Sequence, residues 1–175
     1  MPLNLLWPEP MNTSILSPQL NQPHSTLGEL YLKFELDQQT PAILSIEYAQ
    51  EVLIVPVGRV TAMPNMPKCV LGLLNRRNRV LWVIDLAQML KLQPLDTSVQ
   101  HYNMAIIRVG QEPLGLVVPE VKGVTRFTPD CIQSPQGVVT TVLMPYLHGC
   151  ILQQKEILLV LNAEAIVKSG IIHQN

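Results

Sequence analysis

The chain has 175 residues, of which 47% are hydrophobic and 14% charged, and its formal net charge is -1 at pH 7. This length allows one domain or two closely packed subdomains with a real core, and the near-zero charge excludes a protein that binds nucleic acid through an overall basic balance. No uninterrupted run of 18 apolar residues is present, so the sequence predicts a soluble protein without direct membrane insertion.

Residues 1–27 contain five prolines and many Asn, Ser and Gln residues. This composition predicts a disordered N-terminal tail, and it lacks the charged and apolar regions of a secretory signal. Cytoplasmic residence is therefore expected. Cys69, Cys131 and Cys150 are widely spaced and form no C-x-x-C pair, so neither a disulfide framework nor a zinc site is expected.

A strand pattern begins at Gly28, where GELYLKFELD alternates apolar and polar residues. Similar short segments recur along the chain, separated by turn signals rich in Pro, Gly and Asn. Many short strands at close spacing predict an all-β barrel or sandwich. The expected strands cover residues 28–37, 41–47, 51–55, 69–74, 79–84, 102–109, 114–118, 120–126, 147–153 and 156–161.

Two segments depart from the strand pattern. Asp85 precedes LAQMLKL and Asn162 precedes AEAIVKS, so in each segment an Asx residue occupies the position of a helix N-cap. The apolar residues that follow are three and four positions apart. The sequence therefore predicts short helices at about 85–91 and 162–169, each leaving a buried strand.

These two segments also form an internal repeat at an offset of about 77 residues. Residues 72–90 align with 149–167, and the alignment places Gly72 over Gly149 and Asp85 over Asn162. Each copy contains a strand, a polar hairpin tip, a buried strand and a capped helix, which predicts two similar small β-barrels. The second tip, residues 153–156, contains no arginine, so the fold does not require the arginines of the first tip.

The chain carries no sequence motif that indicates an enzyme. The chain contains no G-x-S-x-G, G-x-G-x-x-G, G-x-x-x-x-G-K-[ST] or H-E-x-x-H motif, and its four histidines are isolated in sequence. We expect no catalytic residue, no cofactor and no metal. A small β-barrel that binds nucleic acid is the alternative, but aromatic residues make up only 5% of the chain and give little stacking surface.

The remaining class is protein interaction, and the basic tip NRRNR at 75–79 is the candidate site. Arginine suits this role because its planar guanidinium forms bidentate bonds to carboxylates and is desolvated more readily than an ammonium. Strand alternation predicts that Arg77 and Arg79 point to one face and Arg76 and Asn78 to the other. Asn78 also has a structural explanation, since Asn tolerates positive φ. A solvated turn whose charges contribute little is the alternative.

The order of motifs over residues 28–170 resembles the CheW family of chemotaxis adaptors. The resemblance rests on YLKFELD, AQEVLIVPVGRVTAMPNMPKCVLGLLNRRNRVLWVIDLAQMLKL, MAIIRVGQEPLGLVVPEVKGVTRF and PYLHGCILQQKEILLVLNAEAIVKS. Its most specific part is the central block, which is similar to the family's V-x-G-[VIL]-[VIL]-N-L-R-G-x-V hairpin followed by D-L. Residues 171–175 fall outside the resemblance and are expected to form a C-terminal tail.

The resemblance implies an all-β fold of two five-stranded SH3-like barrels around a shared core. It implies a non-enzymatic scaffold, recruited to membrane-associated receptor arrays, that couples a methyl-accepting chemotaxis protein or photoreceptor-type transducer to the regulatory domain of a CheA-type histidine kinase. Arg77 matches the family's receptor-contact arginine, in the groove between the barrels. The implied receptor-binding residues are Arg77, Asn75, Arg76, Arg79 and Ala49, and the implied kinase-binding residues are Glu51, Val52 and Val55.

The chain departs from the family pattern at its hairpin tip. Arg76 replaces the usual leucine and Asn78 the usual glycine, so the tip is more basic than the family pattern. Asn162 also replaces an aspartate that is common before the last helix. The form N-R-R-x-R-V-L-W is similar to the adaptors of cyanobacterial phototaxis and type IV pilus clusters, and it favours a transducer of the photoreceptor type.

Overall fold

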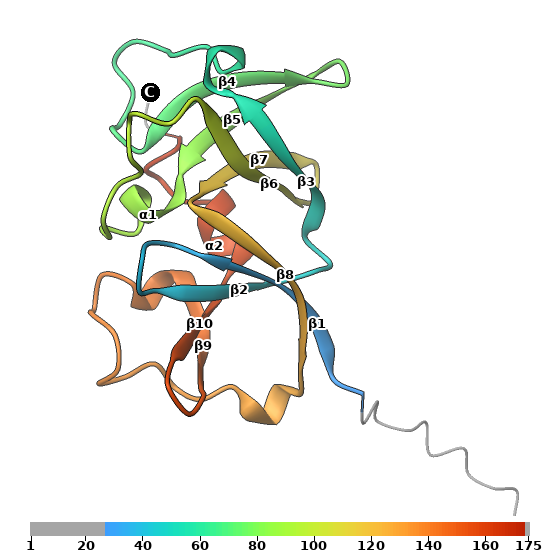
Figure 1. The fold of residues 1–175 in the computed structure, drawn as a ribbon, viewed down its shortest axis with the longest axis vertical. Helices are drawn as coiled ribbons and strands as arrows, with labels where there is room; N and C mark the ends of the chain where they lie inside the picture. The colour runs from blue at the N-terminus through green and yellow to red at the C-terminus, as the bar shows by residue number, and fades with distance from the viewer. Residues whose placement is uncertain (1–26, 174–175) are drawn as a thin grey trace, which may run out of the picture.

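The computed structural model describes residues 27–173, which form ten strands, two short α-helices and three single-turn 3-10 helices (Figure 1). The strands are β1 (Glu29–Glu35), β2 (Pro41–Ser45), β3 (Ala49–Pro56), β4 (Val70–Arg76), β5 (Arg79–Asp85), β6 (His101–Val109), β7 (Glu112–Val118), β8 (Glu120–Phe127), β9 (Leu147–Leu152) and β10 (Ile157–Leu161). The helices are α1 (Leu86–Met89) and α2 (Ala163–Val167), with 3-10 turns η1 (Val57–Arg59), η2 (Pro129–Cys131) and η3 (Met144–Tyr146).

The ten strands form two five-stranded mixed sheets. The first sheet has the order β8-β1-β2-β10-β9, and the second has the order β3-β6-β7-β5-β4. The second sheet is built from one continuous part of the chain, whereas the first combines strands from both ends of the described chain. Figure 1 shows the second sheet above the first, with β8 running down from one to the other.

The two sheets share one pattern of strand pairing. In each sheet, one parallel pair joins two antiparallel parts: β10 with β2 in the first sheet and β5 with β7 in the second. The hairpins β4-β5 and β9-β10 occupy equivalent ends of their sheets, and each is followed by a short helix. The internal repeat predicted from the sequence is therefore confirmed in three dimensions.

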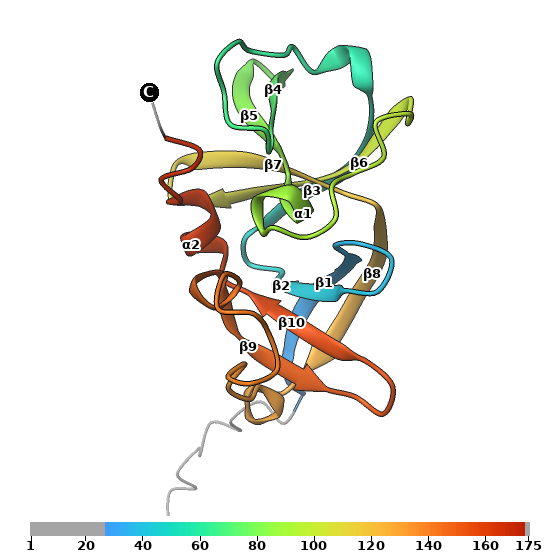
Figure 2. The same cartoon turned by 90° about the vertical axis from the view of Figure 1, so that its left-hand side faces the viewer.

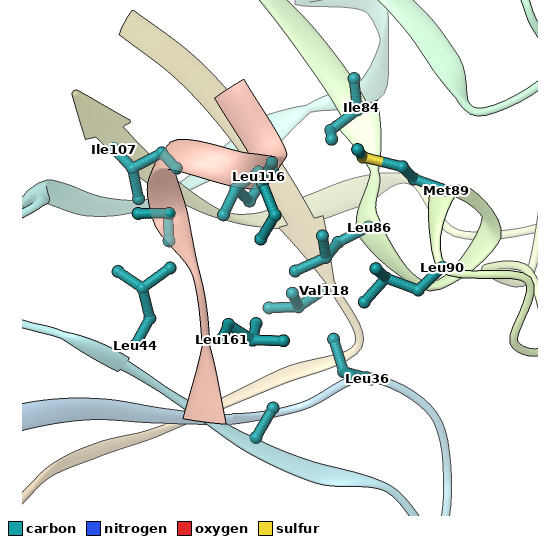
Figure 3. Packing of buried hydrophobic residues seen from close by; sticks show 14 of the residues in the cluster. Leu36, Leu44, Ile84, Leu86, Met89, Leu90, Ile107, Leu116, Val118 and Leu161 are labelled. Atoms are coloured by element: carbon teal, nitrogen blue, oxygen red, sulfur yellow. The ribbon is translucent and has the colours of Figure 1, made fainter. Parts of the chain in front are cut away.

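The core consists of three apolar clusters. One cluster lies within the first sheet and includes Ile43 and Leu158, and another lies within the second sheet and includes Val83 and Met104. The largest cluster lies between the sheets and draws on both, which confirms the expected shared core. Figure 3 shows part of it, with labelled side chains from Leu36, Leu44, Ile84, Leu86, Met89, Leu90, Ile107, Leu116, Val118 and Leu161.

Both helices begin at the predicted caps. The Asp85 carboxylate accepts a hydrogen bond from the backbone N–H of Gln88 at 3.1 Å, and the Asn162 side chain accepts one from Ala165 at 3.1 Å. Each bond satisfies a backbone donor that the first helical turn leaves free. Both helices are shorter than predicted. Helix α2 follows the last strand of the first sheet but contacts β6 and β7 of the second (Figure 2), so it helps to join the two units.

The expected all-β fold is confirmed as two mixed sheets with two short helices, and each of the ten predicted segments corresponds to one observed strand. A disordered N-terminal tail is expected over residues 1–27. Of these, residues 1–26 lie outside the described residues, so the structure describes Leu27 alone. At the other end, Ile172 is buried in the shared cluster, so the packed part of the chain extends beyond residue 170.

Candidate protein-interaction site

The basic tip forms a two-residue turn between β4 and β5. Arg76 and Arg79 are directly paired across the hairpin, and the two residues between them, Arg77 and Asn78, have φ values of 49° and 61°. Positive φ at both central positions is the geometry of a type I′ turn, which matches the twist of the flanking strands. The structural explanation for Asn78 is therefore confirmed, and Arg77 adopts the same uncommon backbone conformation.

The predicted alternation of the arginines is wrong. Directly paired residues of an antiparallel hairpin project to the same face, so Arg76 and Arg79 share a face instead of opposing each other. The physical reason is the turn, because its two residues with positive φ interrupt the strand period on which the prediction depended. The pair Leu74 and Leu81, two residues further into the hairpin, lies on this same face and belongs to the cluster inside the second sheet.

The tip borders a hollow of about 470 Å³ at one end of the second sheet, here called the arginine hollow. Its floor is apolar and includes Leu81 and Ile106, which belong to the cluster inside that sheet. Every strand of the second sheet contributes to the lining, and no residue of the first sheet does. The lining residues are Ala49, Gln50, Glu51, Arg76, Arg77, Arg79, Leu81, Ile106 and Pro113.

Glu51 is the one carboxylate that lines the arginine hollow, and Arg76 binds it with two hydrogen bonds. Arg76 Nε lies 3.3 Å from Glu51 Oε2, and Arg76 Nη2 donates to Glu51 Oε1. The hydrogen bond from Arg76 lowers the pKa of the Glu51 carboxyl, and the same bond raises the pKa of the Arg76 guanidinium. Both groups therefore remain charged at neutral pH.

Arg77 contacts the same carboxylate less closely. Its Nη2 lies 3.6 Å from Glu51 Oε1, and 77% of its side chain is exposed. Arg79 is also exposed, and no carboxylate of residues 27–173 lies within ion-pair distance of it. The rim of the arginine hollow thus carries two guanidinium groups beyond the one that Glu51 neutralises.

The structure brings together four of the five residues expected to bind a receptor. Arg76, Arg77, Arg79 and Ala49 line the arginine hollow, whereas Asn75 is exposed on β4 but does not line it. The resemblance implied a groove between two barrels for Arg77. The hollow is instead lined by strands of the second sheet alone.

The three residues expected to bind a kinase have different surroundings. Glu51 lies in the arginine hollow, Val52 is exposed on β3, and Val55 is buried in the cluster inside the second sheet. Alternation along β3 explains this division, because Leu53 and Val55 face the inner cluster while Val52 and Ile54 face outward. A partner protein can therefore contact the Val52 side chain at the surface of β3, but it cannot reach the Val55 side chain.

The sequence interpretation missed several residues of this region. Leu81, Ile106 and Pro113 form the apolar part of the hollow, and no signal in the sequence linked their three strands to the tip. Ile54 was also missed, and its side chain is 69% exposed beside Val52 at 47%. The strand period could have identified Ile54, since it lies two positions from Val52 on the same face. We call Val52 and Ile54 the β3 stripe.

The outer edges of the sheets differ in how they are covered. Thr61 pairs with Leu73 on the free side of β4, and Gln133 pairs with Cys150 on the free side of β9. Each of these bridges contains two backbone hydrogen bonds. The other two edge strands, β3 and β8, have no such bridge among the described residues. They are the edges open to a partner strand.

No helix within residues 27–173 is long and apolar enough to cross a membrane. The same residues contain no group of three His, Cys, Asp or Glu side chains arranged to hold a metal ion. Cys69, Cys131 and Cys150 are free thiols. Burial raises the pKa of the Cys69 and Cys150 thiols, so both are poor nucleophiles at neutral pH.

Comparison with known proteins places this architecture in one family. Residues 30–170 match the family model described as the CheW-like domain. A probable chemotaxis protein CheW of Rhizobium etli is 29% identical over 106 residues, which cover 61% of this chain and 68% of the relative. The chemotaxis protein CheW of Treponema pallidum is 27% identical over 119 residues, covering 66% of this chain and 70% of the relative.

The fold agrees with a solved structure. The crystal structure of the scaffolding protein TtCheW from Thermoanaerobacter tengcongensis matches with a TM-score of 0.67 and 21% sequence identity, covering 78% of this chain and 90% of that chain. The family match extends over both sheets and includes the arginine tip. The chain therefore belongs to the CheW family, the non-enzymatic scaffolds that couple chemoreceptors to the kinase CheA in chemotaxis signalling.

Proposed function

We propose that this scaffold uses two separate surfaces of its second sheet, with the arginine hollow binding the transducer and the β3 stripe binding the kinase regulatory domain. The observation that carries the proposal is the convergence of three arginines, from a single hairpin tip, on a hollow with an apolar floor. The equivalent hairpin of the first sheet has Gln153, Gln154, Lys155 and Glu156 at its tip. The fold therefore forms this hairpin without arginines, and their presence is explained by binding.

The chemistry of the hollow fits a protein partner. Guanidinium groups on a rim with apolar side chains beneath them resemble the centre of many protein interfaces, where arginine and apolar anchors contribute most of the binding energy. Arg77 is more exposed than Arg76 and Glu51, the other two residues of the ion pairs at the rim, since 77% of its side chain is exposed. A partner side chain can therefore reach Arg77 without displacing any part of the sheet.

The β3 stripe is supported as the kinase surface by a comparison of the two open edges. The bridges at Thr61 and Gln133 are 72 residues apart, and the same offset makes Val52 equivalent to Val124 and Ile54 equivalent to Arg126. On β8 the outward residues are Glu120, Lys122, Val124 and Arg126, and the three charged ones discourage pairing with another chain. On β3 the outward positions Val52 and Ile54 are apolar and no outward residue is charged, so that strand favours contact.

The resemblance also bears on the kind of transducer. The N-R-R-x-R-V-L-W form of the tip is similar to adaptors of cyanobacterial phototaxis and type IV pilus clusters, and the extra arginine at position 76 supports a partner different from that of the usual N-L-R-G tip. A photoreceptor-type transducer at a membrane-associated array in the cytoplasm is the partner that we propose on this ground.

Binding measurements on two partners test the proposal. The full chain is titrated with a CheA-type regulatory domain and, separately, with the cytoplasmic tip of a phototaxis transducer or of a nutrient chemoreceptor. We expect Val52→Glu and Ile54→Glu to weaken kinase binding about tenfold or more, because a charge would be buried in an apolar contact. We expect Arg77→Ala to weaken transducer binding by a similar factor while kinase binding is retained.

Leu152→Glu is the matched control, since Leu152 is 50% exposed on a strand of the first sheet. It should leave both affinities unchanged. If the kinase domain binds neither the wild type nor the variants, the scaffold proposal fails. If Leu152→Glu weakens kinase binding as much as Val52→Glu, the surface assignment fails.

A further inference from the structure

The three arginines of the tip have different partners. Arg76 and Arg77 both approach Glu51 Oε1, but Arg76 alone forms hydrogen bonds to that carboxylate, through Nε and Nη2. A carboxylate held by a two-point guanidinium contact is largely satisfied. Arg77 is therefore left with a longer contact to an oxygen that already has a donor, and 77% of its side chain is exposed.

The position of each arginine in the turn explains this division. Arg76 belongs to β4 and shares its face with Leu74, which directs its side chain over the hollow toward Glu51 on β3. Arg77 is the first central residue of the type I′ turn, with φ 49°, and 77% of its side chain is exposed. Arg79 pairs with Arg76 across the hairpin and is more exposed than it.

The charges around the hollow do not balance. Three guanidinium groups and one carboxylate line it, which leaves an excess of two positive charges above an apolar floor of Leu81 and Ile106. Such an excess favours a partner that brings carboxylates together with an apolar side chain. A solvated tip would need neither the floor nor the close contact between Arg76 and Glu51.

We propose that Arg77 and Arg79 bind carboxylates of an acidic segment of the transducer, and that Arg76 makes this possible by occupying Glu51. The inference rests on the proposed function and specifies its partner chemistry. Without Arg76, Glu51 would attract Arg77 and repel an incoming carboxylate. Arg76 is therefore a positioning residue, whereas Arg77 and Arg79 contact the partner directly.

A double-variant experiment distinguishes this role of Arg76 from simple loss of charge. The probes are a fluorescent acidic peptide with alternating Glu and Leu residues and the same peptide with Gln in place of Glu, both titrated against the full chain by anisotropy. Wild type should bind the Glu peptide at least about tenfold more tightly than the Gln peptide, and this preference should decrease as salt is raised. Arg79→Gln should weaken binding of the Glu peptide, and Arg59→Gln, an exposed arginine on η1, should not.

Arg76→Leu should weaken binding of the Glu peptide about tenfold, and the additional change Glu51→Gln should restore it to within about threefold of wild type. A role of Arg76 as a direct contact predicts no such rescue, so failure of the rescue overturns the positioning role. Equal binding of the Glu and Gln peptides, or tighter binding of a labelled single-stranded oligonucleotide than of the Glu peptide, overturns the acidic partner.

The same series with the transducer tip separates this inference from the proposed function. If the tip binds wild type and its binding is unaffected by Arg79→Gln, the scaffold function stands and the acidic contact is wrong. If no transducer tip binds while the kinase does, the transducer half of the proposed function is wrong.

Discussion

Gly72 on β4 and Gly149 on β9 each lie against the backbone segment that covers the free edge of their strand. A Cβ atom at Gly72 would overlap the carbonyl oxygen of Thr61, and one at Gly149 would overlap the carbonyl oxygen of Gln133. Both contacts would be shorter than real Cβ atoms show. The glycines of the repeat are therefore required by the edge bridges that follow them, at Leu73 and Cys150.

Replacing either glycine by alanine should destabilise the fold. For Gly72→Ala we expect the free energy of unfolding to fall by about 3 kcal/mol, because the new Cβ meets backbone and φ is +145°. For Gly149→Ala we expect a loss of about 2 kcal/mol, from overlap alone. Urea unfolding followed by circular dichroism measures both. Gly58→Ala, with nothing within 4 Å of its added Cβ, should change stability little. Equal effects at Gly58 and Gly149 would contradict the overlap argument.

Asp85 and Asn162 occupy equivalent helix caps but accept different numbers of hydrogen bonds. Asp85 accepts from Gln88 N–H and, through its second oxygen, from Leu95 N–H at 2.9 Å, whereas Asn162 accepts from Ala165 N–H. The first position needs two acceptor atoms, so a carboxylate is required there. At the second position one amide oxygen is enough, so Asn162 can serve as the cap there.

Variants of the two caps should differ accordingly. Asp85→Asn should cost about 2 kcal/mol of unfolding free energy, because an amide nitrogen would face one of the two backbone donors. Asn162→Asp should be close to neutral, and Asn162→Ala should cost about 1 kcal/mol through loss of the cap. Thermal and urea unfolding of the three variants measure these differences. A loss in Asn162→Asp as large as that in Asp85→Asn would show that the second acceptor is not the reason.

The sequence was sufficient to predict the strands, the helix caps and the repeat, because these depend on local periodicity and on short-range hydrogen bonds. It was insufficient for the arginine hollow, since Ile106 and Pro113 reach the tip only through strand pairing between distant segments. It also misplaced Arg76 relative to Arg79, because the strand period does not continue through a two-residue turn. The pairing of Glu51 with Arg76, 25 residues apart, depends on the same long-range geometry.

Val55 provides a test of the inward and outward faces of β3. Its side chain packs in the cluster inside the second sheet, whereas the neighbouring Ile54 is exposed. Val55→Ala should lower the free energy of unfolding by about 2 kcal/mol, through lost burial and the cavity left behind. Ile54→Ala should change it by less than about 0.5 kcal/mol. Chemical denaturation of both variants measures the difference. A reduced kinase affinity in Val55→Ala at unchanged stability would contradict the packing role.

Tyr31 should make the stability of the fold depend on alkaline pH. Burial is the main cause that raises the pKa of this phenol from 10.0 to about 12, and the hydrogen bond from its hydroxyl to Glu29 at 2.9 Å adds to the effect. The unfolded chain loses the proton near pH 10 and the folded chain near pH 12. The free energy of unfolding should therefore fall as pH rises from about 10 toward 12, while below pH 10 the contribution is fully present.

Tyr31→Phe removes the titrating group and keeps most of the ring contacts, including the packing against Phe127 at a centroid distance of 6.4 Å. Below pH 10 the variant should be less stable than wild type by at most about 1 kcal/mol, the contribution of one hydrogen bond. Above pH 10 the difference should shrink and then reverse, because the Tyr31 phenol, whose raised pKa lowers stability in this range, is present only in the wild type. Urea unfolding of both proteins at intervals between pH 8 and pH 11.5 measures the two curves. Parallel curves over this range would mean that the Tyr31 phenol ionises equally easily in the folded and unfolded chain, and that its burial in the first sheet does not influence its titration.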